Sequence, residues 1–359
     1  MRNSTPTPLL VYLVVFLLAG CRSQESAVHT VRSPTVPFDE LFVLEDTVQL
    51  DSAILIGQIA FIDVNPSGEI LVTDHQADIT YLFSSSGDHL RSYSAFACLS
   101  DDVFFYPWST RFLGNEHVVA MQFAGPAVVF KMDGSCYANT KMLMPYAKAI
   151  CIQEDSIFAQ QVWIEEQAKA NVYSPMLEKI EEILIEPPRL ISLNMNYAGQ
   201  RGRTIDCFDD GPYYVYAESM DAIPVRSSSS GIQYRPDFFQ WRPEDLPDAP
   251  PHDINMRRRQ KEYPSTIAVF ALDGSTRMVS YSDLESQWHS GDINADRQLG
   301  LSISSNSGHF PARSTITSVY PQGAGNGYFY AVGENEMLSD GNYGNPLILR
   351  YKFIPPGEE

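Results

Sequence analysis

The sequence is 359 residues long, with a formal net charge of −19 and 44% hydrophobic residues. This length suffices for two ordinary domains or for one large all-β domain. The acidic balance argues against nucleic acid and anionic lipid as partners, because both require basic protein surfaces.

The first residues have the layout of a secretory signal. A polar start with one basic residue, Arg2, precedes an apolar run over Leu9–Leu18, and small residues then lead to Cys21. The run is shorter than the ~20 apolar residues that cross a bilayer. We therefore expect residues 1–20 to be a cleaved signal peptide.

The end of this segment, Leu18-Ala19-Gly20-Cys21, resembles the lipobox of bacterial lipoproteins. The resemblance implies cleavage before Cys21 and lipidation of that cysteine, palmitate included. Two alternatives remain, an ordinary signal with a chance cysteine and a short membrane anchor. Because Arg22 and not Asp follows the cysteine, the resemblance to the sorting pattern of diderm bacteria favours the outer membrane, facing the periplasm or the surface. Residues 21–37 are expected to be the lipidated cysteine and a flexible tether.

The rest of the chain contains four cysteines, Cys98, Cys136, Cys151 and Cys207. An even count in an oxidising compartment predicts disulfides, with buried free thiols as the alternative. Four cysteines allow three pairings, and the sequence does not choose among them. Their spacing matches no zinc pattern, because there is no CxxC and no nearby HxxxH.

Strand-like segments and turn residues recur along the chain. Ile59–Val64, Glu69–Asp74 and Ile79–Phe83 are separated by short polar loops, and His89–Tyr93 follows another turn. Four short antiparallel strands in such a unit make one blade of a β-propeller.

A Phe-x-x-x-Gly pattern marks the repeats. It occurs at Phe83/Gly87, Phe130/Gly134, Phe270/Gly274 and Phe353/Gly357, with a weaker copy at Leu193. The first two phenylalanines are 47 positions apart, whereas the last two are 83 apart; one blade takes ~40–50 residues. We therefore expect a degenerate blade around Val279–Ala312 and six blades in total, with five as the alternative. The segment Glu40–Leu50 is expected to close the ring, which leaves no exposed sheet edge.

These units resemble the six-bladed propellers related to NHL repeats, which include bacterial lipoproteins. The resemblance is sharpest in the first two blades, in Ile62-Asp63-Val64 with Ser67-Gly68, in Ile70–Asp74 and from Phe83 to Gly87. Such propellers include hydrolases, lyases and binding modules, so the resemblance implies a shape and not an activity. The expected fold is an all-β, six-bladed β-propeller over residues 38–359.

Two wide gaps in the repeat predict insertions, at about 160–189 and 218–265, each between the second and third strands of its blade. Equivalent loops emerge on one face of the disc, so the insertions are expected to cap that face. The first is expected to hold one short helix, which Ser174 caps and which ends before Pro187. Its apolar stripe packs on the propeller or, alternatively, binds a partner: Met176, Leu177, Ile180, Ile183 and Leu184.

The second insertion combines aromatic residues with a basic island in an acidic chain. The candidates for ligand contact are Phe238, Phe239, Trp241, Arg257, Arg258 and Arg259. Exposed aromatic residues beside arginine are typical of recognition hot spots and of carbohydrate-stacking surfaces, and a long irregular loop is often functional. Alternatively, the aromatic residues form a small core of the loop and the arginines pair with acidic neighbours.

Signals for catalysis are weak. The sequence contains no nucleophile elbow, P-loop or HExxH motif. Asp63 and Asp206 are expected at or near innermost strands, where lactonase-like propellers place ligands for a central calcium ion. A structural role for both carboxylates is the favoured interpretation.

One fragment resembles an EF-type calcium loop. Asp292, Asn294 and Asp296 match its first, third and fifth positions, but Arg297 and Ile303 replace the Gly of the sixth and the Glu of the twelfth. Losing the turn glycine and the bidentate acid removes most of the expected affinity, so no metal site is assigned.

The sequence thus predicts a lipid-anchored, extracytoplasmic propeller of the cell envelope that acts as a binding or scaffolding module. The expected ligand is an envelope protein, a peptide or a glycan on the face of the insertions, with no nucleic acid, no cofactor and no assigned catalytic residue. The alternative is a metal-dependent hydrolase or lyase that uses the central tunnel. Three or more carboxylates or imidazoles lining that tunnel would favour the enzyme.

Overall fold

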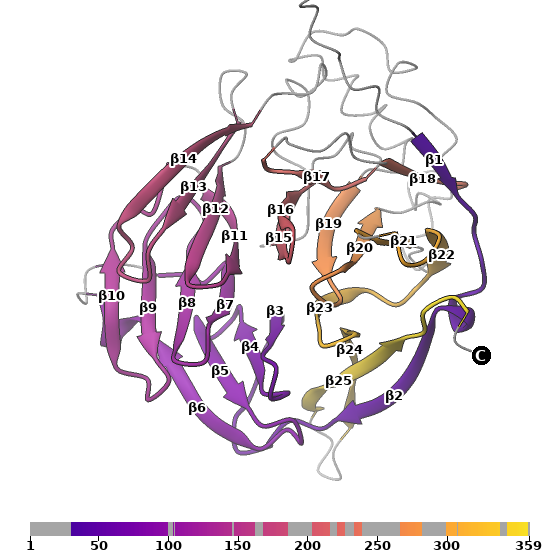
Figure 1. The fold of residues 1–359 in the computed structure, drawn as a ribbon. Coiled ribbons are helices and arrows are strands. Elements are labelled where there is room, and N and C mark those ends of the chain that lie inside the picture. The colour runs from indigo at the N-terminus through magenta and orange to yellow at the C-terminus, as the bar shows by residue number, and fades with distance from the viewer. Residues whose placement is uncertain are drawn as a thin grey trace, which may run out of the picture.

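The computed structural model describes residues 30–99, 103, 105–145, 147–161, 168–185, 203–215, 221–226, 233–238, 266–281, 299–306, 308–337 and 343–357. Six antiparallel sheets stand around a common centre as the blades of a propeller (Figure 1). The all-β, six-bladed architecture is therefore confirmed. Helical structure in the described residues is limited to two 3-10 turns, Phe38–Glu40 and Ala95–Ala97, and no described helix is long and apolar enough to cross a membrane.

The first three blades each contain four strands, which follow one another from the centre outward. Blade A contains β3 (Ile59–Val64), β4 (Ile70–Asp74), β5 (Ile79–Phe83) and β6 (His89–Ser94). Blade B contains β7 (Ser109–Leu113), β8 (His117–Met121), β9 (Ala127–Lys131) and β10 (Cys136–Thr140). Blade C contains β11 (Ala147–Gln153), β12 (Ser156–Gln161), β13 (Ala168–Tyr173) and β14 (Lys179–Ile185).

The other three blades are less uniform. Blade D contains β15 (Ile205–Phe208), β16 (Gly211–Tyr214) and the short β17 (Ile223–Pro224). Blade E contains β19 (Thr266–Ala271), β20 (Thr276–Tyr281), β21 (Leu299–Ser305) and β22 (Arg313–Thr317). Blade F contains β23 (Pro321–Gly325), β24 (Tyr328–Met337), β25 (Tyr343–Phe353) and, on its outer side, β2 (Phe42–Val48).

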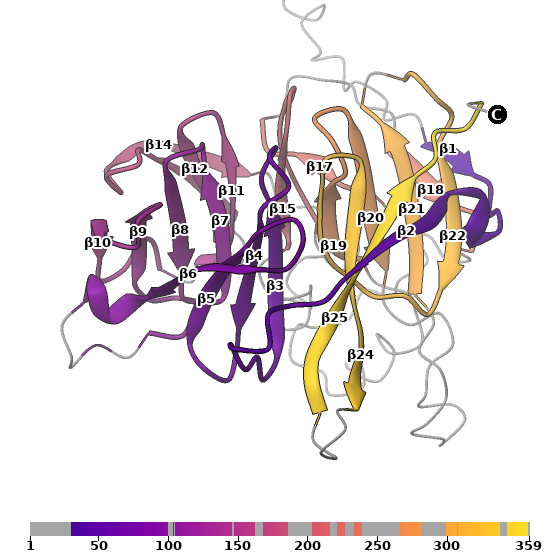
Figure 2. The ribbon, with the colours of Figure 1, turned by 90° about the horizontal axis from the view of Figure 1, so that it is seen from below.

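The ring is closed by a strand from the start of the chain. β2 pairs antiparallel with β25, with Phe42 opposite Phe353 and Val48 opposite Ile348, and Figure 2 shows the two strands side by side. The prediction that a strand within Glu40–Leu50 closes the ring is confirmed. The final blade is thereby built from both ends of the sequence.

The predicted degenerate blade around Val279–Ala312 is wrong. Phe83 and Phe353 each end the third strand of a blade and Phe130 is the next-to-last residue of one, but Phe270 lies on β19, the innermost strand of blade E. The turn at Gly274 therefore joins first and second strands, and blade E extends from β19 to β22 as an ordinary four-stranded sheet. Any hairpin in a blade can carry an aromatic residue before a turn, so this pattern does not identify which hairpin it marks. Leu193 lies outside the described residues.

The predicted insertion at 160–189 and its helix are also wrong. This stretch supplies the two outer strands of blade C, and Ser174 begins a tight hairpin turn in which Leu177 has a φ of 62°. Pairing with β13 along the whole of β14 outweighs the helical spacing of the apolar residues, because strand pairing depends on neighbours that a local pattern does not contain. Of the proposed stripe, Met176, Ile180 and Leu184 are exposed.

The second expected insertion is partly described. β17, which is the third strand of blade D, and β18 (Gln233–Pro236) both fall within it. The expected position of the whole insertion between the second and third strands of its blade is therefore wrong. β1 (Thr30–Ser33) pairs with β18 in parallel, and the backbone N–H of Val36 donates to Ser314 O at 2.8 Å. The part of the expected tether from Thr30 onward is therefore attached to the propeller, as the pairing of β1 and β18 in Figure 1 shows.

Two disulfides join neighbouring blades. Cys98, in the connection after blade A, is bonded to Cys136 on β10, and Cys151 on β11 is bonded to Cys207 on β15. The expectation of disulfides is confirmed, and the structure selects one of the three possible pairings. The second bridge ties together the innermost strands of blades C and D.

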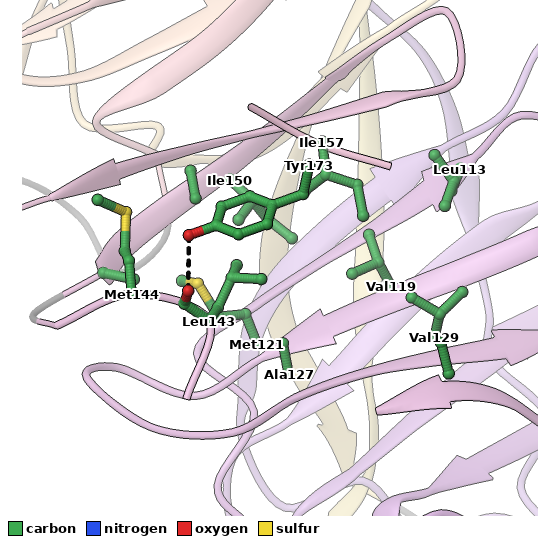
Figure 3. Packing of buried hydrophobic residues seen from close by; sticks show 13 residues of the cluster. Leu113, Val119, Met121, Ala127, Val129, Leu143, Met144, Ile150, Ile157 and Tyr173 are labelled. Carbon is green, nitrogen blue, oxygen red and sulfur yellow. Dashed lines mark hydrogen bonds between the residues drawn. The ribbon is translucent and has the colours of Figure 1, made fainter. Parts of the chain in front are cut away.

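Apolar side chains fill the spaces between adjacent blades. Between blades B and C, Val119, Val129 and Ile157 are fully buried beside Tyr173 (Figure 3). The Tyr173 hydroxyl donates a hydrogen bond of 2.6 Å to Leu143 O, so this phenol is satisfied within the apolar layer. These layers hold the inner strands at fixed positions around the axis.

Candidate functional site

The innermost strands surround the axis of the propeller. They contact one another in the order β3, β7, β11, β15, β19 and β23, and β23 returns to β3. In many propellers this ring encloses an open channel. Here charged side chains from the inner strands fill it.

Arg111 extends from β7 across the centre. Its Nη1 is 3.0 Å from Asp63 Oδ1 on β3, and its Nη2 is 3.0 Å from Asp206 Oδ1 on β15. Its Nε donates to Ile150 O on β11 at 3.3 Å. One guanidinium thus bonds to the inner strands of three other blades, and its planar set of donors allows this.

A second guanidinium lies beside the first. Arg203 Nη1 is 3.4 Å from Asp206 Oδ2, and Nη2 donates to Ile62 O. Its plane lies over the Phe61 ring, with the guanidinium carbon 4.1 Å from the ring centroid. Asp63, Arg111, Arg203 and Asp206, which we call the axial cluster, are each no more than 8% exposed, and their formal charges cancel.

Burial and neighbouring charges act differently on the two guanidinium groups. Burial is the largest single influence on Arg111 and lowers its pKa, but Asp206 and Asp63 together outweigh it and raise the pKa. Burial, followed by the positive charge of Arg111, lowers the pKa of Arg203 to about 9. Arg111 is therefore the better compensated charge of the axial cluster.

The two carboxylates of the axial cluster also tie adjacent blades together. Asp63 Oδ2 accepts the backbone N–H of Phe112 at 2.9 Å, and Asp206 Oδ2 accepts that of Ala271 at 3.0 Å. In each case an aspartate on one inner strand holds the inner strand of the next blade. The expected structural role of Asp63 and Asp206 is confirmed. Among the described residues, no group of three or more His, Cys, Asp or Glu side chains could hold a metal ion.

A hollow of about 410 Å³ lies on the side of the disc where first strands turn into second strands. Arg111, Asp63 and Asp206 form its base. We call this hollow the funnel. All six blades contribute one residue each to its wall: Asn65, Asn115, Glu154, Cys207, Asp273 and Asn326.

The opposite end of the inner strands has another repeated feature. Four of these strands carry a bulge near their start, at Ala60, Lys148, Ile267 and Gln322. Bulges redirect a side chain and interrupt the ladder. Burial lowers the pKa of Lys148 to about 8, and the ammonium forms no ion pair with a described residue.

The predicted ligand-contact residues are only partly visible. Phe238 is half-buried and packs on Tyr281, with ring centroids 5.4 Å apart. It belongs to the apolar layer between blades D and E. The other proposed positions lie outside the described residues: Cys21, Phe239, Trp241, Arg257, Arg258, Arg259, Asp292, Asn294 and Asp296.

Sequence reasoning missed both arginines of the axial cluster. Arg111 does have a local signal, because a charged residue in the short strand Ser109–Leu113 interrupts an otherwise uncharged segment. Arg203 has none, because it precedes a strand, and of its partners only Asp206 is close in sequence, whereas Ile62 and Phe61 are distant. Only the ring arrangement brings Arg203 next to Phe61 and Asp63.

No family model matches the chain, and no curated protein matches it in sequence. A putative exported protein from Bacteroides fragilis has a similar structure, with a TM-score of 0.61 at 12% identity over 91% of this chain and 100% of that chain. A member of the DUF4221 family from Bacteroides vulgatus has a TM-score of 0.55 at 10% identity over 88% of this chain and 98% of that chain. At these identities the similarity shows a shared propeller fold alone.

Proposed function

We propose that this chain is exported, lipidated at Cys21 and held at the cell envelope, where its propeller acts as a binding or scaffolding module for an envelope protein, a peptide or a glycan. The closed axis carries the proposal. Four carboxylates line the axial hollow, Asp63, Glu154, Asp206 and Asp273, a number that by itself favours the enzyme alternative. Asp63 and Asp206, however, are both ion-paired with Arg111. Each charged side chain of the axial cluster is engaged by an opposite charge and by backbone groups. Such groups are poor candidates for a general base, a nucleophile or a metal ligand.

Export is supported by the disulfides as well as by the signal-like start. Both bridges pair cysteines from different strand units, and bonds of this kind persist in oxidising compartments. The resemblance of Leu18–Cys21 to a lipobox supports the lipid anchor, and Arg22 favours the outer membrane. The relation to NHL repeats remains part of this proposal.

The proposed ligand surface begins at Phe238. This ring is fixed against blade E, so its role is to anchor the segment that continues to Phe239 and Trp241. We assign ligand contact to these two residues and to Arg257–Arg259.

The lipid anchor is tested by replacing Cys21 with Ser. Wild-type chain should incorporate a palmitate analogue and partition into detergent with the outer membrane, whereas Cys21→Ser should appear in the soluble fraction without label. A labelled Cys21→Ser variant would contradict lipidation at this residue.

The binding role is tested by thermal unfolding of the full chain with a panel of cell-wall glycans, together with cross-linking in intact envelopes. A ligand at 100 times its Kd adds ~2.7 kcal/mol to the free energy of unfolding, a shift of a few degrees. Deleting residues 239–260 should abolish the response and leave the Tm nearly unchanged. A large fall in Tm would show that the segment is structural, and stability lost with EDTA and restored by calcium would favour the enzyme alternative.

A further inference from the structure

The funnel has the dimensions of a binding site. Its volume of about 410 Å³ falls within the range of ~300–1,000 Å³ that is usual for ligand pockets. Its described lining includes no residue of the aromatic and arginine segment. Phe238, the described residue of the surface proposed above, is not among the described lining residues.

The base of the funnel offers no free cation to an anion. Arg111 is the one basic side chain in the described lining, and both of its terminal nitrogens are paired with carboxylates at 3.0 Å. Arg203, behind the base, is paired with Asp206. The charge of the axial cluster cancels, so the base is polar without being positive.

The rim, in contrast, carries surplus negative charge. Glu154 and Asp273 line the funnel from blades C and E, and neither forms an ion pair within the part of the chain that the structure describes. Asp273 Oδ1 accepts the N–H groups of Ser275 and Thr276, which leaves Oδ2 for a ligand. The funnel thus presents two carboxylates whose counter-charge does not come from the described protein.

Asparagine side chains add further acceptors. Asn326 donates its Nδ2 hydrogen to Asn65 O at 2.7 Å, so its amide oxygen is left to accept. Asn115 lies on the neighbouring rim of blade B. Acceptors and negative charge together suit a ligand that donates several hydrogen bonds and is positively charged.

We propose that the funnel binds one cationic group, an ammonium or a guanidinium, with Glu154 and Asp273 as its counter-charges. The buried base fixes the shape of the pocket, and the net charge of −19 on the chain attracts cations toward it. Basic side chains of peptides and free polyamines both carry such a group. The two kinds of ligand share the cationic group, but in a peptide it is attached to a polypeptide backbone and in a polyamine to an alkyl chain.

The experiment is isothermal titration of the full chain with spermidine, with an N-acetyl-Gly-Lys-Gly amide and with an N-acetyl-Gly-Gln-Gly amide as the neutral match, because a free N-terminus would itself carry an ammonium group. We expect binding of at least one cationic probe at about 50 mM salt that weakens several-fold at roughly 300 mM, and no binding of the neutral peptide. A response to the lysine peptide alone identifies a basic side chain as the ligand, and a response to spermidine alone identifies a free amine. Absence of binding by both cationic probes, or equal binding of the neutral peptide, overturns the proposal.

Matched variants assign the binding to the rim. Glu154→Gln combined with Asp273→Asn keeps the side-chain shapes and the Asp273 turn, and should weaken binding by about tenfold or more. Glu40→Gln, on the 3-10 turn outside the funnel, should bind as wild type does. Binding that is unchanged in the double variant overturns the proposal; if that variant does not fold, the single variant Glu154→Gln gives the same readout. Deleting residues 239–260 should leave this binding intact, so it is judged independently of the proposed function.

Discussion

Two groups of buried charges differ in how many parts of the molecule they connect. The axial cluster links the inner strands of five blades through Arg111, Arg203 and their partners. The other group is the ion pair of Arg277 Nη2 with Asp221 Oδ2, 2.9 Å long, between blades E and D. Asp221 also accepts the N–H of Tyr234 at 2.9 Å, which holds β18 near this boundary.

The difference shows what makes a buried charge tolerable. Removing charges from water is costly, and an opposite charge repays the cost only when hydrogen bonds satisfy the remaining donors and acceptors. In the isolated pair, burial is the largest influence on Asp221 and raises its pKa despite Arg277. In the axial cluster the two carboxylates outweigh burial at Arg111. We expect the cost of disruption to follow the number of partners that are lost.

The strongest test of this comparison is Asp206→Ala. The substitution removes partners of Arg111 and Arg203 and the acceptor of the Ala271 N–H. Leaving buried charges uncompensated should lower the free energy of unfolding by about 4–5 kcal/mol, measured by urea denaturation. Asp206→Asn, which keeps an acceptor but not the charge, should lose less, and a loss below about 2 kcal/mol for the alanine variant would contradict the axial cluster's importance.

Asp221→Ala should have a smaller effect. It removes the partner of one arginine, Arg277, and the acceptor of the Tyr234 N–H, and should cost about 3 kcal/mol in the same assay. Replacing both members, with Asp221→Leu and Arg277→Met, should recover most of that loss, because an isolated buried pair can be exchanged for apolar packing. If Asp221→Ala destabilises as much as Asp206→Ala, the proposed dependence on partner number is wrong.

The disulfide beside the axial cluster gives a third test. Replacing Cys151 and Cys207 with Ala should lower the free energy of unfolding by about 2 kcal/mol. Because Cys207 is next to Asp206, this loss should not add simply to that of Asp206→Ala in a double-mutant cycle. The control is the corresponding replacement of Cys98 and Cys136, which lie away from the axis and should be additive. If both disulfides show the same coupling energy with Asp206→Ala, the Cys151–Cys207 bridge is not specially linked to the axial cluster and the prediction is wrong.

The smallest expected effect concerns Lys148, a partly buried charge with no described ion-pair partner. Burial lowers its pKa from 10.5 to about 8, so between these values the unfolded chain binds more protons and the free energy of unfolding rises with pH. Lys148→Met lacks this dependence. It should be more stable than wild type by about 1 kcal/mol near pH 7, less than the ~3 kcal/mol equivalent of the full pKa difference because solvent screens the partly exposed ammonium, with an advantage that shrinks toward pH 10.5. Thermal unfolding across this pH range tests the prediction, and a constant difference would contradict it.

Much of the fold could be predicted because blade repeats are local. Turn residues and apolar runs identified blade A strand by strand, and the spacing of Phe83 and Phe130 gave a blade length. The pattern places Phe270 on the wrong strand, because the local sequence of a hairpin between first and second strands is the same as that of a hairpin between third and fourth strands. The segment after Ser174 misled for a related reason, since its apolar residues fit a helix as well as the outer strand that β13 stabilises.

Only the two carboxylates of the axial cluster could be predicted from the sequence. Asp63 and Asp206 could be placed on inner strands from the repeat, and their structural role followed from the family resemblance. Their partners could not be inferred, because Arg111 is 48 positions from Asp63 and 95 from Asp206. Contacts across the axis join blades that are not adjacent, and a repeat pattern carries no information about them.

The pairing of β2 with β25 governs when the molecule can be completed. Asp46 and Arg350 face each other across this pairing at 3.1 Å, although 304 positions separate them. The N-terminal end emerges first from a ribosome or a translocation pore, so the early blades can form while the rest of the chain is still to come. The ring stays open until β25 has emerged and can pair with β2. Throughout that interval the edge of β2 is unprotected, and such edges are prone to aggregation and proteolysis. If the propeller is exported, as proposed above, we expect it to need chaperones at the moment of release.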